Sequence, residues 1–285
     1  MGLAATLLHV LLLMAGLAPF GLGVLLAHAS GFPLAGPALA LEILGVVALF
    51  LAALAGREAY APRLGRWPSL GGLGQANWQR LANACLALAS MLVLLLQGVW
   101  QTGDFTLPLA ALGILGGYFS FAPPIAWYRR GWGELWAGLC FGLLPVLTGF
   151  YLQSRHLISE ILFYGLPLSL AAFNLFLVLG FPESGQDGER CSLASRLSPA
   201  GVGLLYTVIN ILVILCLVIN LFFPAAGHRS RPWLWALIAL AVVNQELVKK
   251  RAYYQAARIQ LLGFLTLALH LGMSFLFALG LWGRL

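Results

Sequence analysis

Two acidic residues four positions apart form the most informative pattern in the sequence. Glu183 and Asp187 lie in the segment FPESGQDGER, directly after a long apolar stretch. If the helix continues through this segment, the spacing places both carboxylates on one helix face. Proteins commonly hold Mg²⁺ with one or two carboxylates together with substrate phosphates, and arginines such as Arg190 suit bidentate phosphate contacts. The pattern indicates a candidate magnesium diphosphate site, although a solvated acidic loop interrupted by glycines remains the alternative.

A second segment, YFSFAPPIAWYRRGWGEL at residues 118–135, combines a double proline with aromatic, basic and acidic residues. The prolines predict the end of a helix. The aromatic residues that follow, Tyr128 among them, are typical of an aromatic belt at a membrane interface, and Arg129 and Arg130 are typical of positive anchors on the inner side. Taken alone, the segment is explained by these interfacial roles.

The composition shows which class of protein must position these residues. Of 285 residues, 61% are hydrophobic and 9% are charged, and the mean hydropathy is +0.92. These values exclude a disordered chain, a disulfide scaffold and a soluble enzyme. The net charge of +7 falls in short clusters between apolar runs, which indicates membrane topology and contact with lipid rather than with nucleic acid. The four cysteines show no CxxC pairing, so the sequence indicates no zinc site.

We predict an all-α, polytopic membrane protein that forms a single transmembrane helical domain over residues 1–285. A spanning helix needs about 20 mainly apolar residues. About nine segments meet this need, and the first is a spanning helix rather than a signal peptide, because it is long and lacks a basic start. The segments are 3–27, 36–56, 81–100, 106–126, 134–153, 158–180, 201–223, 232–247 and 260–282.

The distribution of Lys and Arg predicts the orientation of these spans. With nine spans and the N-terminus in the cytoplasm, twelve of the sixteen basic residues fall in inner segments, as the positive-inside rule requires. Three inner segments, 57–80, 127–134 and 181–199, are longer or more polar than a simple connection needs. We therefore expect an integral, multi-pass protein whose active-site loops face the cytoplasm.

These segments resemble a known family. The run YFSFAPPIAWYRRGWGELWAGLCFGLLPVLTGFYLQ is similar to the fourth and fifth helices of UbiA-type prenyltransferases, especially the 1,4-dihydroxy-2-naphthoate polyprenyltransferase branch. FPESGQDGER resembles the second acidic motif of that branch. Weaker similarities are APFGLGVLLAHASG in the first helix and GGLGQ after the second. Together the motifs cover most of residues 17–197 in matching order.

The resemblance implies nine helices around a central cavity, and a reaction that joins a polyprenyl diphosphate to an aromatic acceptor in quinone biosynthesis, such as that of menaquinone. It implies Mg²⁺ as the cofactor and assigns roles to residues of the two segments. Glu183 and Asp187 correspond to metal-binding catalytic residues, Tyr128 to a catalytic residue of the Tyr-Arg turn, and Arg129 and Arg190 to diphosphate-binding residues. Neither the prenyl chain length nor a protein partner is indicated.

The sequence departs from the family at the first acidic motif, Asn-x-x-x-Asp-x-x-x-Asp. The corresponding stretch reads AGREAYAPR at residues 55–63, where Glu58 is the remaining acid and Arg57 and Arg63 are basic. We expect Glu58 to contribute to a weakened metal site, and Arg57 to act as a diphosphate clamp. The chain has only two aspartates, Asp104 and Asp187, so no displaced Asp-rich motif exists elsewhere.

Three functions remain open at this point. The first is a divergent prenyltransferase with one well-formed magnesium site, and the second is a non-catalytic relative that binds a prenyl lipid or quinone, or serves as a membrane subunit. A transporter is disfavoured, because the spans are almost free of the mid-membrane charges that transport requires. The five histidines do not cluster by spacing, and Glu42 is interpreted as a carboxylate that snorkels to the outer surface, with a buried functional acid as the alternative.

Overall fold

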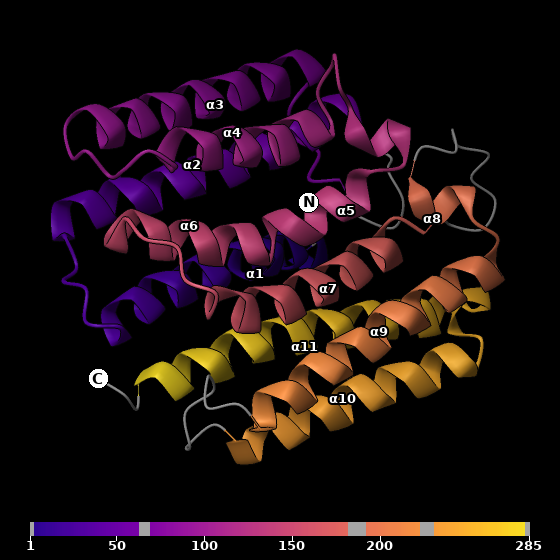
Figure 1. Cartoon of the computed structure of the whole chain (residues 1–285). Helices are drawn as coiled ribbons and strands as arrows, with labels where there is room; N and C mark the ends of the chain where they lie inside the picture. The colour runs from indigo at the N-terminus through magenta and orange to yellow at the C-terminus, as the bar shows by residue number, and fades with distance from the viewer. Residues whose placement is uncertain (1–2, 63–68, 182–191, 223–230, 283–285) are drawn as a thin grey trace.

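The computed structural model describes residues 3–62, 69–181, 192–222 and 231–282, and these residues form a bundle of helices without strands (Figure 1). Eleven α-helices are present in the described chain. They are α1 (Leu3–Ala29), α2 (Gly36–Tyr60), α3 (Gln75–Gly98), α4 (Thr106–Gly116), α5 (Gly133–Cys140), α6 (Leu143–Ser154), α7 (Ile161–Leu179), α8 (Leu193–Arg196), α9 (Pro199–Phe222), α10 (Arg231–Lys249) and α11 (Ala256–Trp282). Short 3-10 turns lie at Tyr118–Ser120 (η1), Trp127–Arg130 (η2) and Ala252–Tyr254 (η3).

The predicted all-α membrane fold is confirmed, whereas the number of nine spans is not. Each of the nine predicted segments contains helix, but within the described residues seven spans are long and apolar enough to cross a membrane. The fourth predicted segment is the short apolar stretch Thr106–Ser120, and the eighth, α10, is not among the seven. Polar residues such as Asn244, Gln245 and Glu246 near the end of α10 lower its apolar character.

The fifth predicted span is broken in the middle. Helix α5 ends at Cys140 and α6 begins at Leu143, with Phe141 and Gly142 between them. The break frees backbone groups that need partners in an apolar environment. The backbone N–H of Leu143 donates a hydrogen bond to Ser169 Oγ of α7 at 2.7 Å. A side chain at Gly142 would collide with the backbone of Ser169, so the glycine allows α7 to supply this partner.

Helices α1 and α6 pack closely because glycines lie where they cross. A Cβ atom at Gly23 would overlap the carbonyl oxygen of Val146, and a Cβ atom at Gly149 would overlap the carbonyl oxygen of Phe20. Helices in membranes commonly pack through small residues, because lipid provides no hydrophobic force that favours helix association. The two glycines therefore fix α6 against α1 on one side of the break.

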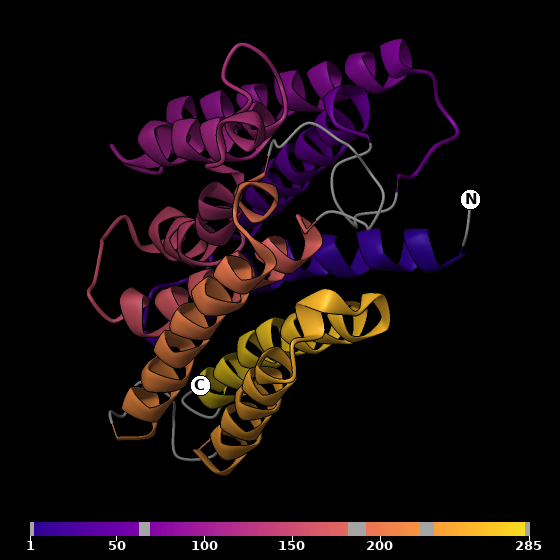
Figure 2. The same ribbon diagram turned by 90° about the vertical axis from the view of Figure 1, so that its right-hand side faces the viewer.

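Helix α7 occupies the middle of the bundle. It contacts α1, α5, α6, α9 and α11, and 72% of its most apolar window is buried, the largest share among the seven spans. In Figure 2, α2, α3 and α4 lie in the upper part of the molecule, and α10 and α11 lie in the lower part. The helices before α7 and those after it therefore form two groups, which meet at α7 and where α1 packs against α11.

The polar connections gather at one end of this bundle. The chain after α2, the turn η2 and helix α8 all lie at the right-hand end of the molecule in Figure 1. Described basic residues at the ends of helices or in connections here are Arg57, Arg80, Arg129, Arg130, Arg196, Lys249, Lys250, Arg251 and Arg258. The described parts of the three segments predicted to share one side of the membrane thus lie at one end of the bundle. That this side is the cytoplasm remains a prediction.

Candidate functional site

An apolar cavity of about 150 Å³ runs between the helices of the first group. It is lined by residues of α1 to α7 together with η1 and η2, and no described residue of α9, α10 or α11 contributes. On α2 the lining runs from Glu42 through Gly45 and Leu49 to Leu54, so the cavity follows the helix over several turns. The central cavity expected from the resemblance is therefore present, but it is built by the helices that precede α9.

Aromatic rings concentrate toward the end of the cavity where η2 lies. Phe121 stacks on Tyr128 with ring centroids 5.1 Å apart, and Phe141 packs between Phe50 at 5.1 Å and Phe176 at 4.7 Å. All five rings line the cavity. Aromatic faces attract cations, so this end of the cavity provides a dry environment that can stabilise positive charge in a bound molecule.

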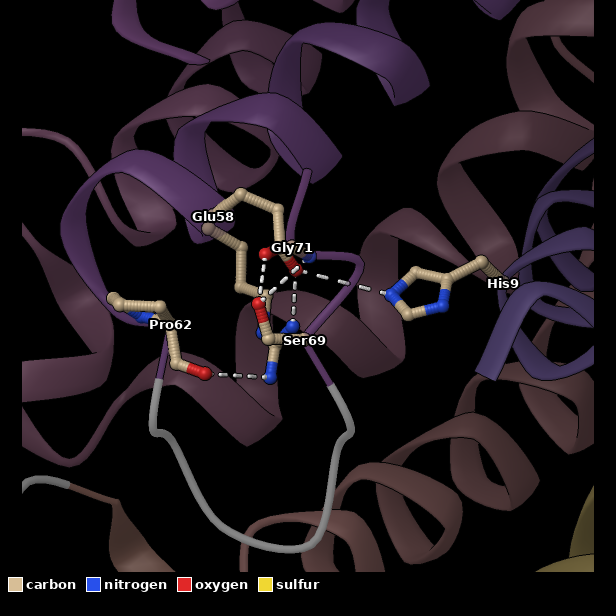
Figure 3. Close-up of polar contacts among 6 residues, drawn as sticks. His9, Glu58, Pro62, Ser69 and Gly71 are labelled. Atoms are coloured by element: carbon tan, nitrogen blue, oxygen red, sulfur yellow. Dashed lines mark hydrogen bonds and ion pairs between the residues drawn. The ribbon is translucent and has the colours of Figure 1, made fainter. Parts of the chain in front are cut away.

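Glu58, at the end of α2, is the centre of a polar cluster beside this aromatic end (Figure 3). Its Oε1 accepts a hydrogen bond from Arg57 at 2.5 Å, and its Oε2 accepts one from Ser69 Oγ at 2.5 Å. His9 of α1 lies 4.0 Å from Oε1. Both carboxylate oxygens of Glu58 are thus engaged by side chains of the protein.

The cluster lies between the apolar cavity and a second, more polar hollow. His9 lines the apolar cavity, whereas Glu58 lines a hollow of about 260 Å³ with Ser69, Gln75 and Trp78. The 4.0 Å contact between His9 and Glu58 therefore joins the two spaces. A molecule with an apolar chain and a polar head could place the chain in the cavity and the head near Glu58.

Arg57 is fully buried and lines neither space. One NH group pairs with Glu58 and another donates to the carbonyl of Pro62 at 3.5 Å. A guanidinium group has donors only, in a fixed planar fork. In this arrangement Arg57 fixes the Glu58 carboxylate, and its predicted role as a direct diphosphate ligand stays a prediction.

Tyr128 and Arg129, adjacent in sequence, lie in different environments. Tyr128 is 3% exposed and lines the apolar cavity, whereas the Arg129 side chain is exposed. Burial raises the pKa of Tyr128 well above its usual value; the nearby Glu134 raises it further and Arg57 opposes the shift. The structure brings Tyr128 to the site as a neutral phenol and leaves Arg129 at the surface, outside the cavity.

The second acidic segment lies outside the described residues, and with it Glu183, Asp187 and Arg190. Its two flanks are described and are held together. Ser192 Oγ donates to the carbonyl of Gly180 at 2.9 Å, and the fully buried Glu134 accepts a hydrogen bond from Ala194 N at 3.2 Å. These contacts hold α5, the end of α7 and α8 next to one another.

Helix α8 is also attached to η2. Arg196 donates to the carbonyl oxygen of Arg129 at 2.6 Å. Gly131 has a φ of +81°, and a Cβ there would lie 3.2 Å from Arg196 Nε. Glycine thus permits both the left-handed turn and the close approach of the arginine. The Tyr-Arg turn and the flank of the second acidic segment are therefore joined directly by this hydrogen bond.

The described residues do not by themselves fit a magnesium site. No group of three or more His, Cys, Asp or Glu side chains that could hold a metal occurs in the part of the chain that the structure describes. Mg²⁺ prefers several free oxygen ligands, and both oxygens of Glu58 already have partners. The prediction that Glu58 binds metal is therefore untested, and it would require Arg57 or Ser69 to release the carboxylate.

Sequence reasoning missed two members of the site. His9 and Ser69 were not associated with Glu58, because both lie far from it in the chain; a lone histidine in an apolar span was the one available signal. The preferred interpretation of Glu42 as a snorkelling carboxylate is wrong, and the alternative of a buried acid agrees with its burial. Glu42 is 1% exposed and accepts a hydrogen bond from Gln153 Nε2 at 2.7 Å, so contact with α6 holds it inside the protein.

Comparison with solved structures identifies the fold class of the chain. The fold matches that of a UbiA homolog from Aeropyrum pernix K1, whose apo structure covers 93% of this chain and 97% of its own with a TM-score of 0.60 at 16% sequence identity. No protein-family model matches the chain. The chain is thus a polytopic helical membrane protein with a UbiA-like fold.

A curated protein is similar to this chain in amino-acid sequence. The chain is 27% identical over 157 residues to the 1,4-dihydroxy-2-naphthoate octaprenyltransferase of Bacillus subtilis (strain 168). The match covers 53% of this chain and 49% of that protein, so the chain spans about half the length of the curated relative it matches. The two likenesses together support membership of the UbiA-type superfamily.

Proposed function

We propose that the chain is a divergent intramembrane prenyltransferase that transfers a polyprenyl group from its diphosphate to an aromatic acceptor such as 1,4-dihydroxy-2-naphthoate. The observation that carries the proposal is the long apolar cavity whose aromatic end lies beside the Glu58 cluster. The chain of a polyprenyl diphosphate is apolar and matches the cavity. The described lining of the hollow beside Glu58 has no cation, so the diphosphate needs the counter-charge that we assign to Mg²⁺ and Arg190. The sequence likeness to a naphthoate prenyltransferase supports the same substrate class.

In the proposed reaction the allylic C–O bond breaks, diphosphate leaves with the electron pair, and a ring carbon of the acceptor attacks the allylic cation. The ring then loses a proton to restore aromaticity. The aromatic lining at Phe121, Tyr128, Phe141 and Phe176 excludes water and stabilises the cation. The neutral phenol of Tyr128 can donate a hydrogen bond to the departing diphosphate.

The roles of the charged residues follow from their positions. Arg57 holds the Glu58 carboxylate, and Glu58 faces the hollow in which we place the polar head of the substrate. Glu183, Asp187 and Arg190 remain the proposed ligands of Mg²⁺ and diphosphate, on sequence resemblance alone. Bound Mg²⁺ would neutralise the charge of the leaving diphosphate.

A second candidate function is a non-catalytic protein that binds a prenyl lipid or quinone in the same cavity. It is favoured by one observation: Arg57 and Ser69 engage both oxygens of Glu58, where the family places a metal-binding motif. The two candidates share the cavity and differ in whether the diphosphate is cleaved.

The test is prenyl transfer by the purified full chain in nanodiscs, supplied with Mg²⁺, allylic diphosphates of several lengths and a panel of aromatic acceptors. Mass spectrometry detects the prenylated product, and a phosphate assay detects diphosphate release. The proposal expects product in the wild type and none in Asp187→Asn. Absence of both product and diphosphate release in folded protein would instead establish the non-catalytic function.

A further inference from the structure

Glu42 lies at the opposite end of the apolar cavity from the Glu58 cluster. Both residues belong to α2 and are sixteen positions apart, which corresponds to about 24 Å along the helix at about 1.5 Å per residue. Glu42 lines the cavity and is 1% exposed. An ionisable side chain buried within a membrane span is costly to place there and usually has a function.

Only one of the two carboxyl oxygens of Glu42 is explained by packing. Oε2 accepts the hydrogen bond from Gln153 Nε2, and the side-chain oxygen of Gln153 accepts one from Ala35 N at 3.2 Å. This arrangement ties the start of α2 to the end of α6. The other oxygen, Oε1, is buried and has no hydrogen-bond partner. A buried acceptor without a partner is destabilising, so the structural tie alone does not account for it.

The other polar side chains that line this end of the cavity already have partners. Thr106 Oγ1 pairs with Thr102 Oγ1 at 2.8 Å, and Thr148 Oγ1 donates to the carbonyl of Leu144 at 2.8 Å. Their neighbours in the lining, such as Val46 and Leu109, are apolar. The two hydroxyl groups keep acceptor lone pairs, but Oε1 of Glu42 is the buried oxygen in this part of the described cavity that has no partner at all.

We infer that Glu42 forms a distal subsite that accepts a hydrogen bond from a hydroxyl group at the far end of a long apolar ligand. The subsite lies too far from the Glu58 cluster for a small aromatic acceptor to reach both, since about 24 Å of α2 separates them. It therefore recognises the end of a chain that extends along the cavity. The inference uses the geometry of the cavity and holds whether or not the protein transfers prenyl groups.

The experiment measures binding of matched isoprenoid alcohols to the full chain in nanodiscs. Farnesol, geranylgeraniol and geranylfarnesol are each compared with the same molecule carrying a hydroxyl at its terminal methyl carbon. One neutral hydrogen bond corresponds to about a fivefold difference in Kd. We expect the hydroxylated form of the chain that spans the cavity to bind about fivefold more tightly than its parent, and we expect no preference for chains too short to reach Glu42.

Two variants separate recognition from structure. Glu42→Leu should abolish the preference while the unmodified alcohol binds at least as well as before. Thr148→Val, in the same lining, should keep the preference, because the hydroxyl of Thr148 is already bonded within its own helix.

Equal Kd values for every pair in the wild type would overturn the inference, and this comparison requires no variant to fold. A preference that survives in Glu42→Leu would overturn it as well. Because the probes carry no diphosphate and undergo no reaction, neither result depends on whether the protein is an active transferase.

Discussion

The buried pair of Arg57 and Glu58 allows a prediction whose size follows from the structure. The two side chains are 0% and 1% exposed, and they are joined at 2.5 Å. Removing one partner of a buried ion pair typically costs about 3–5 kcal/mol, because the remaining charge is left uncompensated. We therefore expect Arg57→Met, which keeps much of the side-chain volume but has no charge, to destabilise the protein by about 3 kcal/mol or more.

The assay is thermal unfolding of the purified protein in one detergent at a fixed heating rate. At about 2 °C per kcal/mol for a chain of this size class, the loss in Tm is about 6 °C or more. The double variant Arg57→Met/Glu58→Leu removes both charges and should recover most of this loss, since apolar replacement of a whole buried pair is often neutral. Arg80→Met, at an exposed arginine with one long hydrogen bond to Asn77 at 3.4 Å, is the control and should change Tm little.

Two results would refute this reasoning. A Tm for Arg57→Met that equals that of the control would show that Glu58 needs no counter-charge. A double variant no more stable than the single one would show that the loss comes from packing around Arg57 and not from the unpaired carboxylate.

Three further predictions concern packing, the helix break and pH. Gly149→Val should lower Tm by several degrees, because the valine side chain would overlap the backbone of α1. Gly21→Val, with open space around it, is the control and should have little effect. Equal effects on Tm would contradict the close crossing of α1 and α6. Ser169→Ala should cost about 1–3 kcal/mol, because it leaves the first backbone N–H of α6 without its partner; an unchanged Tm would show that another group replaces the hydroxyl. Burial raises the pKa of Tyr128, so the folded protein keeps this phenol protonated as pH rises above about 10, where the unfolded chain loses the proton. The free energy of unfolding should therefore fall over that pH range. Tyr128→Phe should remove that part of the pH dependence, and an identical pH profile would contradict the assignment.

The sequence predicts the helical segments well and the break at Gly142 poorly. Runs of apolar residues long enough to span a membrane are a strong local signal, which is why the predicted segments coincide with helices. The stretch 135–147 around the break carries no polar side chain, so its hydropathy gives no sign of a break. The break is stabilised by Ser169 on another helix, and contacts of this kind are invisible to a local pattern.

The candidate site shows the same limit. The resemblance identified Glu58 as the remaining acid of a degraded motif, but it could not show that Arg57, Ser69 and His9 surround it, because the fold brings these segments together. The error at Glu42 has a similar cause. Glu42 lies near a helix end, which suggested an exposed side chain. Its hydrogen-bond partner Gln153 is 111 positions away in the chain, so the contact that keeps Glu42 buried is not visible in the local sequence.

The central claim is that the apolar cavity holds the prenyl chain of the substrate. The most direct test is photolabelling of the full chain in nanodiscs with a prenyl diphosphate that carries a diazirine on its chain, followed by mapping of the modified residues by mass spectrometry. We predict labels on cavity residues of α2 and α4, such as Leu49 and Ala110, that unlabelled prenyl diphosphate competes away. Labels confined to outward-facing residues such as Leu94 and Leu204, without competition, would contradict the account.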